Sequence, residues 1–571
     1  MAIRAKLSSE TLFRLFLIVW GILNLFQAIL TPLNPDEAYY WMYSNYPAWG
    51  YFDHPPMIAM MIRAGYSVSG NQLGLRLFVV MAQLVSFILL WQLLDDIKKN
   101  KANVFFLILL ICSLPVVNIF GFFATPDSPL LLFEILFLFL YRKFSGKYEW
   151  KYAILLGVSM AAIMYSKYHG AILIIMVILS DLRLLKNPRS YIALLFAIIL
   201  FVPHIIWQNS NDFPSVNYHI IDRASGITFK EFPQYLLNTL IIQNPLILPA
   251  GLVILFTKRN SDRFERTLSF IIPGVILFFL ITSFRYHVEP HWTALIALPL
   301  VIIIFNNIDF GRTIYRYLMP VVIASVFLII LMRIVFMFNI LPVKYIRHNY
   351  HESKRWFIEI EKIAGERPVV FTNSYQNASK YTFYTGKFSH SLNNLNYRKN
   401  QYDIWDFEEK LHGKEILYVP HFLDGGYKEK LDKYPTSYGD TIFARKFFKF
   451  QSLQRECCIL KEESYSFSKG DTCRIDIVIF NPYPYQIDLK HEEFPVRFQA
   501  CFFRDGILMF NEFLKFSKAL RFIDPGESVN ISASFTIDDV PAGDYKIAVC
   551  SETGIEYITY NSKFKDATII E

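Results

Sequence analysis

Long apolar runs separated by short polar loops fill the first 341 residues of the chain, and the first of these runs extends from Leu12 to Leu30. A helix that crosses a membrane needs roughly 20 predominantly apolar residues. At that length the pattern predicts about eleven membrane-spanning segments, the last from Tyr317 to Leu341. Beyond it the chain is polar to its end. The sequence therefore predicts an α-helical multi-span membrane domain over residues 1–341, followed by polar C-terminal domains.

Composition supports a membrane protein. The chain has 571 residues, of which 53% are hydrophobic, and its mean hydropathy is +0.30, which is too apolar for a soluble enzyme of this size. The 53 Phe and 34 Tyr fit membrane helices with aromatic residues at the lipid–water interface. The net charge of +8 would suggest nucleic acid in a soluble protein. Here the basic residues cluster in short loops, so we predict contact with membrane lipid and no nucleic-acid partner.

Loop charge predicts the topology, because Lys and Arg stay preferentially on the cytoplasmic side. The basic loops are Asp95–Lys101, Arg142–Lys151, Asp181–Arg189, Lys258–Arg266 and Arg312–Arg316. The loops predicted on the outer side are Thr31–Asn71, Ala124–Ser128, Gln208–Gln234 and Phe284–His291. Basic loops flank residues 152–180, which are too few for two full spans, so we expect two short helices that meet near Lys167 on the outer side. An odd number of spans places the C-terminal domains outside as well.

The C-terminal region divides into two patterns. Over residues 342–450, helix-like and strand-like segments alternate, with a helix predicted at Glu352–Ala364 and strands at Pro368–Thr372 and Glu415–Val419, which indicates a small α/β domain. Over residues 451–571 the alternation has period two, as in a β-sandwich of immunoglobulin-like type. The strands predicted there are Arg474–Phe480, Val496–Phe503, Val529–Ile537 and Tyr545–Cys550.

Five of the six cysteines fall in the predicted sandwich: Cys457, Cys458, Cys473, Cys501 and Cys550. An oxidising compartment would allow disulfides, but the odd number leaves one cysteine unpaired and the connectivity cannot be deduced. No Cys-x-x-Cys or Cys/His spacing typical of a metal site is present. We expect structural or free cysteines.

The most informative stretch is the loop from Asn34 to Pro56, in which the adjacent acids Asp36 and Glu37 follow the first apolar run. Charge beside hydrocarbon is costly and marks functional sites by default. Such a carboxylate can act as a general base on an acceptor hydroxyl, or bind a divalent cation that neutralises phosphate. Alternatively, Asp36 caps a helix and Glu37 complements its dipole; the two interpretations are compatible.

Two further acids lie in predicted outer loops. Asp127 occupies a turn between two spans, on the side predicted for Asp36, and either shares its site or caps the following helix. Asp53 and His54 end the first loop beside Pro55 and Pro56. An isolated Asp-His pair is weak evidence for a metal, whereas two prolines favour a rigid turn.

Basic residues on the same side are candidate phosphate ligands: Lys167, His169, Arg223, Arg285, His287 and His291. Arg offers phosphate a bidentate fork and Lys a point charge, although Arg, His and Trp also occur at the interface without such a role. The acids would activate the acceptor or hold a metal, and the cations would stabilise the departing phosphate. Because no P-loop or Rossmann fingerprint is present, this combination favours a lipid-phosphate donor.

The segments Asn34–Tyr40 and Gly50–Pro56 resemble the first outer loop of the bacterial dolichyl-phosphate-mannose–protein mannosyltransferase-like superfamily, which includes the lipid A aminoarabinose transferases. Thr125–Leu130, Ser166–Gly170 and Arg285–Trp292 resemble later segments of that superfamily. The resemblance implies a GT-C fold and an inverting transfer from a polyprenyl-phosphate sugar on the outer face of the bacterial inner membrane, with the C-terminal domains in the periplasm.

Carried over by residue, the resemblance implies catalytic roles for Asp36, Glu37 and Asp127, and phosphate binding by Lys167 and Arg285. Some members bind a divalent cation, whose ligands are not matched in this sequence. The acceptor stays open between lipid A, another glycan and a protein, and the C-terminal sandwich, absent from the common short form, is a candidate to select it. A glycan transporter or polymerase partner, or a non-catalytic binding member, are the alternatives.

Overall fold

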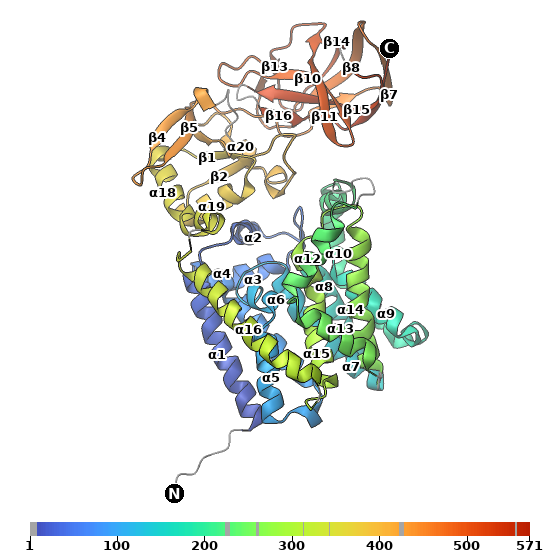
Figure 1. Ribbon diagram of the computed structural model, residues 1–571. Coiled ribbons are helices and arrows are strands. Elements are labelled where there is room, and N and C mark those ends of the chain that lie inside the picture. The colour runs from blue at the N-terminus through green and yellow to red at the C-terminus, as the bar shows by residue number, and fades with distance from the viewer. Residues whose placement is uncertain are drawn as a thin grey trace. The chain divides into compact units, whose positions relative to one another are not determined.

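The computed structural model describes residues 8–222, 229–258, 262–311, 313–341, 343–421, 428–538, 540–553 and 557–571. Arg223, one predicted phosphate ligand, lies outside these residues, as do parts of the predicted basic loops 258–266 and 312–316. The chain forms two compact units, Met1–Glu352 and Ser353–Glu571. The first is helical and the second rich in β-sheet (Figure 1).

Among the described residues of the first unit, six helical segments are long and apolar enough to cross a membrane. They are α1 (Ser9–Leu30), α4 (Gln72–Leu93), α10 (Pro188–Ser210), α14 (Arg263–Thr282), η4 with α15 (Pro290–Asn307) and α16 (Thr313–Met337). The helices α12 (Phe232–Ile242) and α13 (Ile247–Thr257) would add a seventh as one span bent by 89°. The chain is therefore a multi-pass membrane protein.

The predicted number of about eleven spans was too high for the described residues, because several apolar runs form short helices. These are α5 (Lys101–Cys112), α8 (Trp150–Ser166) and α9 (Gly170–Ser180), whereas α3 (Met57–Val68) is a further short helix within the predicted outer loop. Helix α7 (Asp127–Lys147) is long enough, but Asp127, Glu134, Arg142 and Lys143 interrupt its apolar surface. The prediction of two short helices that meet near Lys167 is confirmed by α8 and α9.

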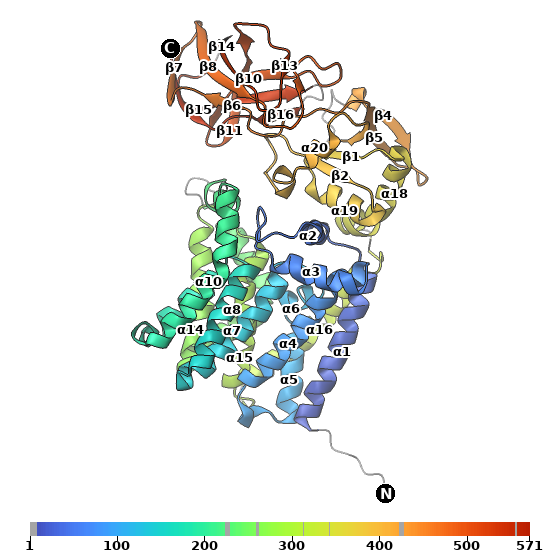
Figure 2. The ribbon, with the colours of Figure 1, turned by 180° about the vertical axis from the view of Figure 1, so that it is seen from behind.

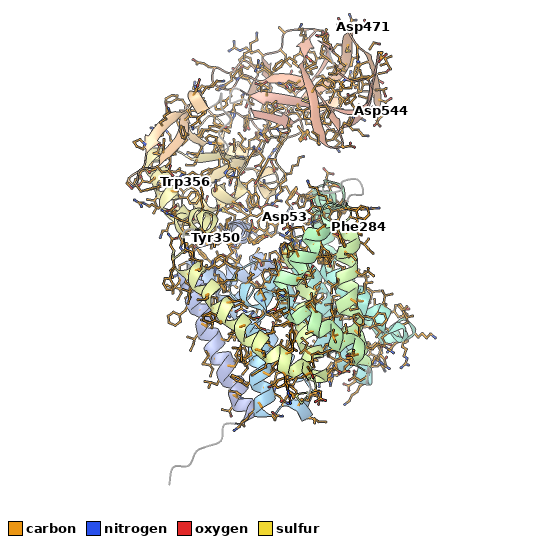
Figure 3. All side chains as sticks on the ribbon, in the orientation of Figure 1. Asp53, Phe284, Tyr350, Trp356, Asp471 and Asp544 are labelled. Carbon is orange, nitrogen blue, oxygen red and sulfur yellow. The ribbon has the colours of Figure 1, made fainter. Side chains whose placement is uncertain are left out.

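Helix α2 (Pro35–Asn45) lies across one end of the helical unit, and α1 begins at the opposite end (Figures 1 and 2). Asp53, Phe284 and Tyr350 lie at the same end as α2 (Figure 3). Helices α3 and α4 approach closely nearby, since a Cβ added to Gly65 would lie 2.2 Å from the carbonyl oxygen of Gly74. That approach fixes the start of α4 beneath the α2 segment.

The first sheet of the second unit confirms the predicted α/β pattern. Its strand order is β2-β1-β3-β5-β4, with β1 parallel to β2 and β3, and β5 antiparallel to β3 and β4. The strands are β1 (Val369–Thr372), β2 (Ser389–Leu392), β3 (Ile416–Val419), β4 (Asp432–Pro435) and β5 (Thr441–Phe447). Its helices are α18 (Ser353–Ala364), α19 (Tyr375–Thr385) and α20 (Phe407–Leu411).

The remaining strands form a sandwich whose main sheets have the orders β11-β10-β15-β17-β7, with β16 on β15, and β12-β14-β8-β6. Residues alternate between buried and exposed along β8 (Thr472–Phe480) and β14 (Ser528–Thr536), as expected for a sheet with one face on a core. The other strands of these sheets are β6 (Cys458–Leu460), β7 (Ser464–Ser468), β10 (Arg497–Arg504), β11 (Ile507–Phe513), β12 (Lys515–Phe516), β15 (Gly543–Thr553), β16 (Tyr557–Tyr560) and β17 (Lys565–Ile570). All six cysteines are free thiols.

Candidate active site

The start of α2 directs Asp36 toward a cavity. The side chain of Asn34 accepts a hydrogen bond from the Asp36 amide, and the Glu37 carboxylate accepts one from the Asn34 amide, both at 2.9 Å. These bonds form a capping box with Pro35 in the first turn. The cap is therefore Asn34 and not Asp36, as the alternative interpretation had it, and the half-buried side chain of Asp36 lines the cavity.

Glu37 has a different position from its neighbour. Its side chain is fully buried and forms a bidentate ion pair with Arg76, with Oε1–Nε at 2.7 Å and Oε2–Nη2 at 2.6 Å. Oε1 also accepts the amide of Ala124 at 2.8 Å. Both oxygens are engaged and Glu37 does not line the cavity, which favours a positioning role over the predicted catalytic one. Its partner Arg76 was not among the predicted site residues.

The cavity has a volume of about 390 Å³, and all the described residues that line it belong to the first unit. Its walls are largely apolar, with Phe120, Phe122, Phe123, Ile329, Met332 and Phe336 among them. Its acidic and basic lining side chains are Asp36, His54, Asp127, His291 and Arg333. Four of the predicted site residues therefore meet around one space. Arg333 was not predicted.

Asp127 and Lys167 form a second buried ion pair, with 2.8 Å between Oδ1 and Nζ. Asp127 lies in the first turn of α7 and Lys167 at the C-terminal end of α8, so each charge complements the dipole of its helix. The His291 Nε2 lies 3.9 Å from Asp127 Oδ2. Asp127 lines the cavity, whereas Lys167 contacts Asp127 without lining the cavity itself.

The Asp53-His54 turn places its two side chains in different surroundings. Asp53 accepts a hydrogen bond of 2.6 Å from the hydroxyl of Tyr43, and burial with the adjacent Asp53 carboxylate raises the pKa of Tyr43 well above its usual range. His54 lines the cavity. Burial lowers the pKa of His54 to about 4, so its ring is neutral near pH 7 and cannot serve there as a cation for phosphate.

The remaining predicted basic residues do not line the cavity. His169 packs against Trp292, with ring centroids 4.6 Å apart. His287 is exposed, and its Nδ1 lies 2.7 Å from a carboxylate oxygen of Glu231. Arg285 is exposed in the turn after α14. These positions favour surface or packing roles for the two histidines.

The expected divalent cation finds no ligand set in the described part of the chain. No group of three or more His, Cys, Asp or Glu side chains there could hold a metal ion. Asp127, a candidate metal ligand by its residue type, is already paired with Lys167. The divalent cation therefore stays a prediction.

Arg76 and Arg333 each interrupt an apolar helix, α4 and α16. An ionisable residue inside a membrane segment is a functional hypothesis by default. That signal, present in the sequence at both positions, could have added both residues to the predicted site.

A multi-pass helical unit of this kind has counterparts among known proteins. A family profile described as dolichyl-phosphate-mannose-protein mannosyltransferase matches residues 53–207. The structure of ArnT from Cupriavidus metallidurans in the apo state is similar with a TM-score of 0.57 and 13% identity, over 76% of this chain and 98% of that chain. The structure of the same protein bound to undecaprenyl phosphate gives a TM-score of 0.56 at 13% identity, with the same coverage.

No curated protein matches the sequence. At this identity the structural likeness establishes the fold, and the helical unit with its sheet-rich C-terminal region has the ArnT-like GT-C fold. The GT-C fold predicted from the sequence is therefore confirmed, with the smaller number of spans given above.

Proposed function

We propose that the protein transfers a sugar, with inversion, from a polyprenyl-phosphate donor to an acceptor on the outer face of a bacterial inner membrane. The observation that carries this proposal is the largely apolar cavity into which Asp36 and Asp127 both project. An apolar wall suits a polyprenyl chain, and the carboxylates suit an acceptor hydroxyl. The matching family description names a dolichyl-phosphate sugar, and ArnT has been seen with undecaprenyl phosphate.

In the proposed reaction Asp36 is the general base. Its carboxylate takes the proton of the acceptor hydroxyl while the hydroxyl oxygen attacks the anomeric carbon from the side opposite the phosphate. The bond between that carbon and the phosphate oxygen breaks, and its electron pair stays on the oxygen. The products are the glycosylated acceptor and the polyprenyl phosphate monoester, and the proton on Asp36 returns to solvent. Attack from the opposite side inverts the anomeric configuration.

Asp127 and Lys167 support this site as a pair. The Lys167 ammonium keeps Asp127 ionised in a buried position, since an unpaired buried carboxylate would take up a proton. Asp127 can then accept a hydroxyl of the sugar or of the acceptor, or orient His291 beside it. We assign Lys167 this indirect role rather than direct phosphate binding, because Asp127 already engages its ammonium.

The acceptor is proposed only by class: lipid A, another envelope glycan or a protein with an available hydroxyl or amine. Mass spectrometry of lipid A and surface glycans tests the proposal in three strains, which carry the wild type, Asp36→Asn or no copy of the protein. A product heavier by one sugar residue is expected with the wild type alone. The same product in the Asp36→Asn strain, with equal protein in the membrane, would contradict the assignment of Asp36.

A further inference from the structure

The guanidinium of Arg333 stands out among the cavity side chains. Arg333 is the only Arg or Lys among the described residues that line the cavity. It lies in α16, is 5% exposed, and forms no ion pair with any described residue. A charge buried in a membrane segment is costly unless a partner compensates it.

The structure holds this guanidinium in one orientation. Its Nε donates to Oδ1 of Asn118 and its Nη2 to Oδ1 of Asn24, both at 2.9 Å. Its central carbon lies 5.0 Å from the ring centroid of Trp20. The helices α1 and α16, which carry Asn24 and Arg333, lie side by side (Figures 1 and 2). The side-chain amides of Asn24 and Asn118 thus accept hydrogen bonds from two of the three guanidinium nitrogens of Arg333 and none from the third.

That third nitrogen, Nη1, is buried and has no hydrogen-bond partner among the described residues. Gln27, a fully buried neighbour on the cavity wall, has an unpartnered acceptor, Oε1. Its Nε2 donates to Oγ1 of Thr31 and to the carbonyl of Arg333 at 3.3 Å. Buried polar groups are nearly always paired, so this end of the cavity is built for a ligand with an anionic group and a neighbouring hydroxyl.

We infer that Arg333 is the residue that binds the phosphate of the polyprenyl-phosphate ligand, with Nη1 donating to a phosphate oxygen and Asn24 and Asn118 positioning the fork. This inference rests on the proposed function for the identity of the ligand. It moves the phosphate site from the predicted Lys167, which is paired with Asp127, to Arg333 in α16. Apolar side chains of α16 next to Arg333, such as Ile329 and Met332, line the same cavity and suit the first isoprene units.

The test compares binding of a polyprenyl phosphate and of the matching uncharged polyprenol to the purified full chain in detergent. We expect the wild type to prefer the phosphate by about 10- to 100-fold, the range of a charge-assisted hydrogen bond. In Arg333→Gln this preference should fall close to one while polyprenol binding persists. Arg142→Gln is the matched control, because Arg142 is a half-buried arginine of α7 that does not line the cavity, and it should keep the preference.

A wild-type preference retained by Arg333→Gln would overturn the inference. If Arg333→Gln binds neither lipid, Arg333→Lys decides, since it keeps the charge without the fork: a preference several-fold below wild type supports the inference and an unchanged one overturns it. A sugar-transfer assay on the same preparations separates the two proposals. Transfer by the wild type with an unaltered preference in Arg333→Gln rejects the subsite alone. A lost preference in Arg333→Gln without transfer by the wild type supports the subsite and rejects the transferase function.

Discussion

Glu37 and Arg76 form a bidentate ion pair, 2.6 and 2.7 Å long, in which neither side chain is exposed. Arg76 also donates to the backbone carbonyls of Ala28 and Thr31 at 2.9 and 2.7 Å, and Glu37 accepts the amide of Ala124. The pair therefore joins the end of α1, the start of α2, the start of α4 and the turn before α7. Because α2 carries Asp36 and α7 carries Asp127, this ion pair fixes the positions of the two cavity acids relative to each other.

Breaking this pair should destabilise the helical unit. Arg76→Met leaves a buried carboxylate without its partner, which costs about 3–5 kcal/mol in comparable cases, and we expect a lower unfolding temperature in detergent and loss of activity. Glu10→Gln is the control, because Glu10 and Arg14 form a pair that is 61% and 73% exposed and such pairs contribute about 0–1 kcal/mol. Equal unfolding temperatures for Arg76→Met and Glu10→Gln would reject the positioning role.

The Asp127–Lys167 pair allows stability and activity to be separated. Lys167→Met leaves a buried carboxylate without its partner, and Asp127→Asn leaves a buried ammonium without its partner, so each variant should lower the unfolding temperature. The double variant leaves neither charge, so its unfolding temperature should fall by less than the sum of the two single decreases. Sugar transfer should be lost in all three variants. Asp127, which lines the cavity, is replaced in two of them, and in Lys167→Met it loses the ammonium that keeps it ionised. Recovery of transfer in the double variant along with its stability would show that the pair has a structural role alone.

A pH dependence follows from His54. Its pKa is about 4 in the folded chain and about 6.5 in an unfolded one. As the pH falls from 6.5 to 4 the unfolded chain takes up a proton that the folded chain does not, so stability is lost over this interval, by about 3 kcal/mol in total. His54→Gln removes that loss. Unfolding temperatures of both proteins at pH 7 and pH 4.5 provide the check, because their difference cancels all other titrating groups.

The expected change is a shift in favour of His54→Gln on acidification. If the difference between the two unfolding temperatures is the same at pH 7 and pH 4.5, His54 titrates alike in both states and its pKa is not lowered in the folded chain.

The sequence located Asp36 and Asp127 because each follows or precedes an apolar run, a local feature visible without a structure. It could not show that Glu37 turns away from Asp36, since that depends on Arg76, which lies 39 residues further along the chain. Arg333 is visible in the sequence as a charge in an apolar run, but its contacts could not be predicted, because its partners Asn24 and Asn118 are 309 and 215 residues away. The count of spans failed where an apolar run forms a helix too short to cross a membrane, as in α5 and α9, because apolar composition does not reveal where a helix ends.

The central claim is that Asp36 drives the release of polyprenyl phosphate from a lipid-linked sugar. The most direct measurement incubates membranes that contain the wild type or Asp36→Asn with the cell's own lipid-linked sugars and acceptors, and quantifies free polyprenyl phosphate by mass spectrometry. We predict release that depends on acceptor with the wild type and none above background with Asp36→Asn. Glycan movement or assembly without release of polyprenyl phosphate by the wild type would instead identify a transporter or polymerase partner and contradict the account.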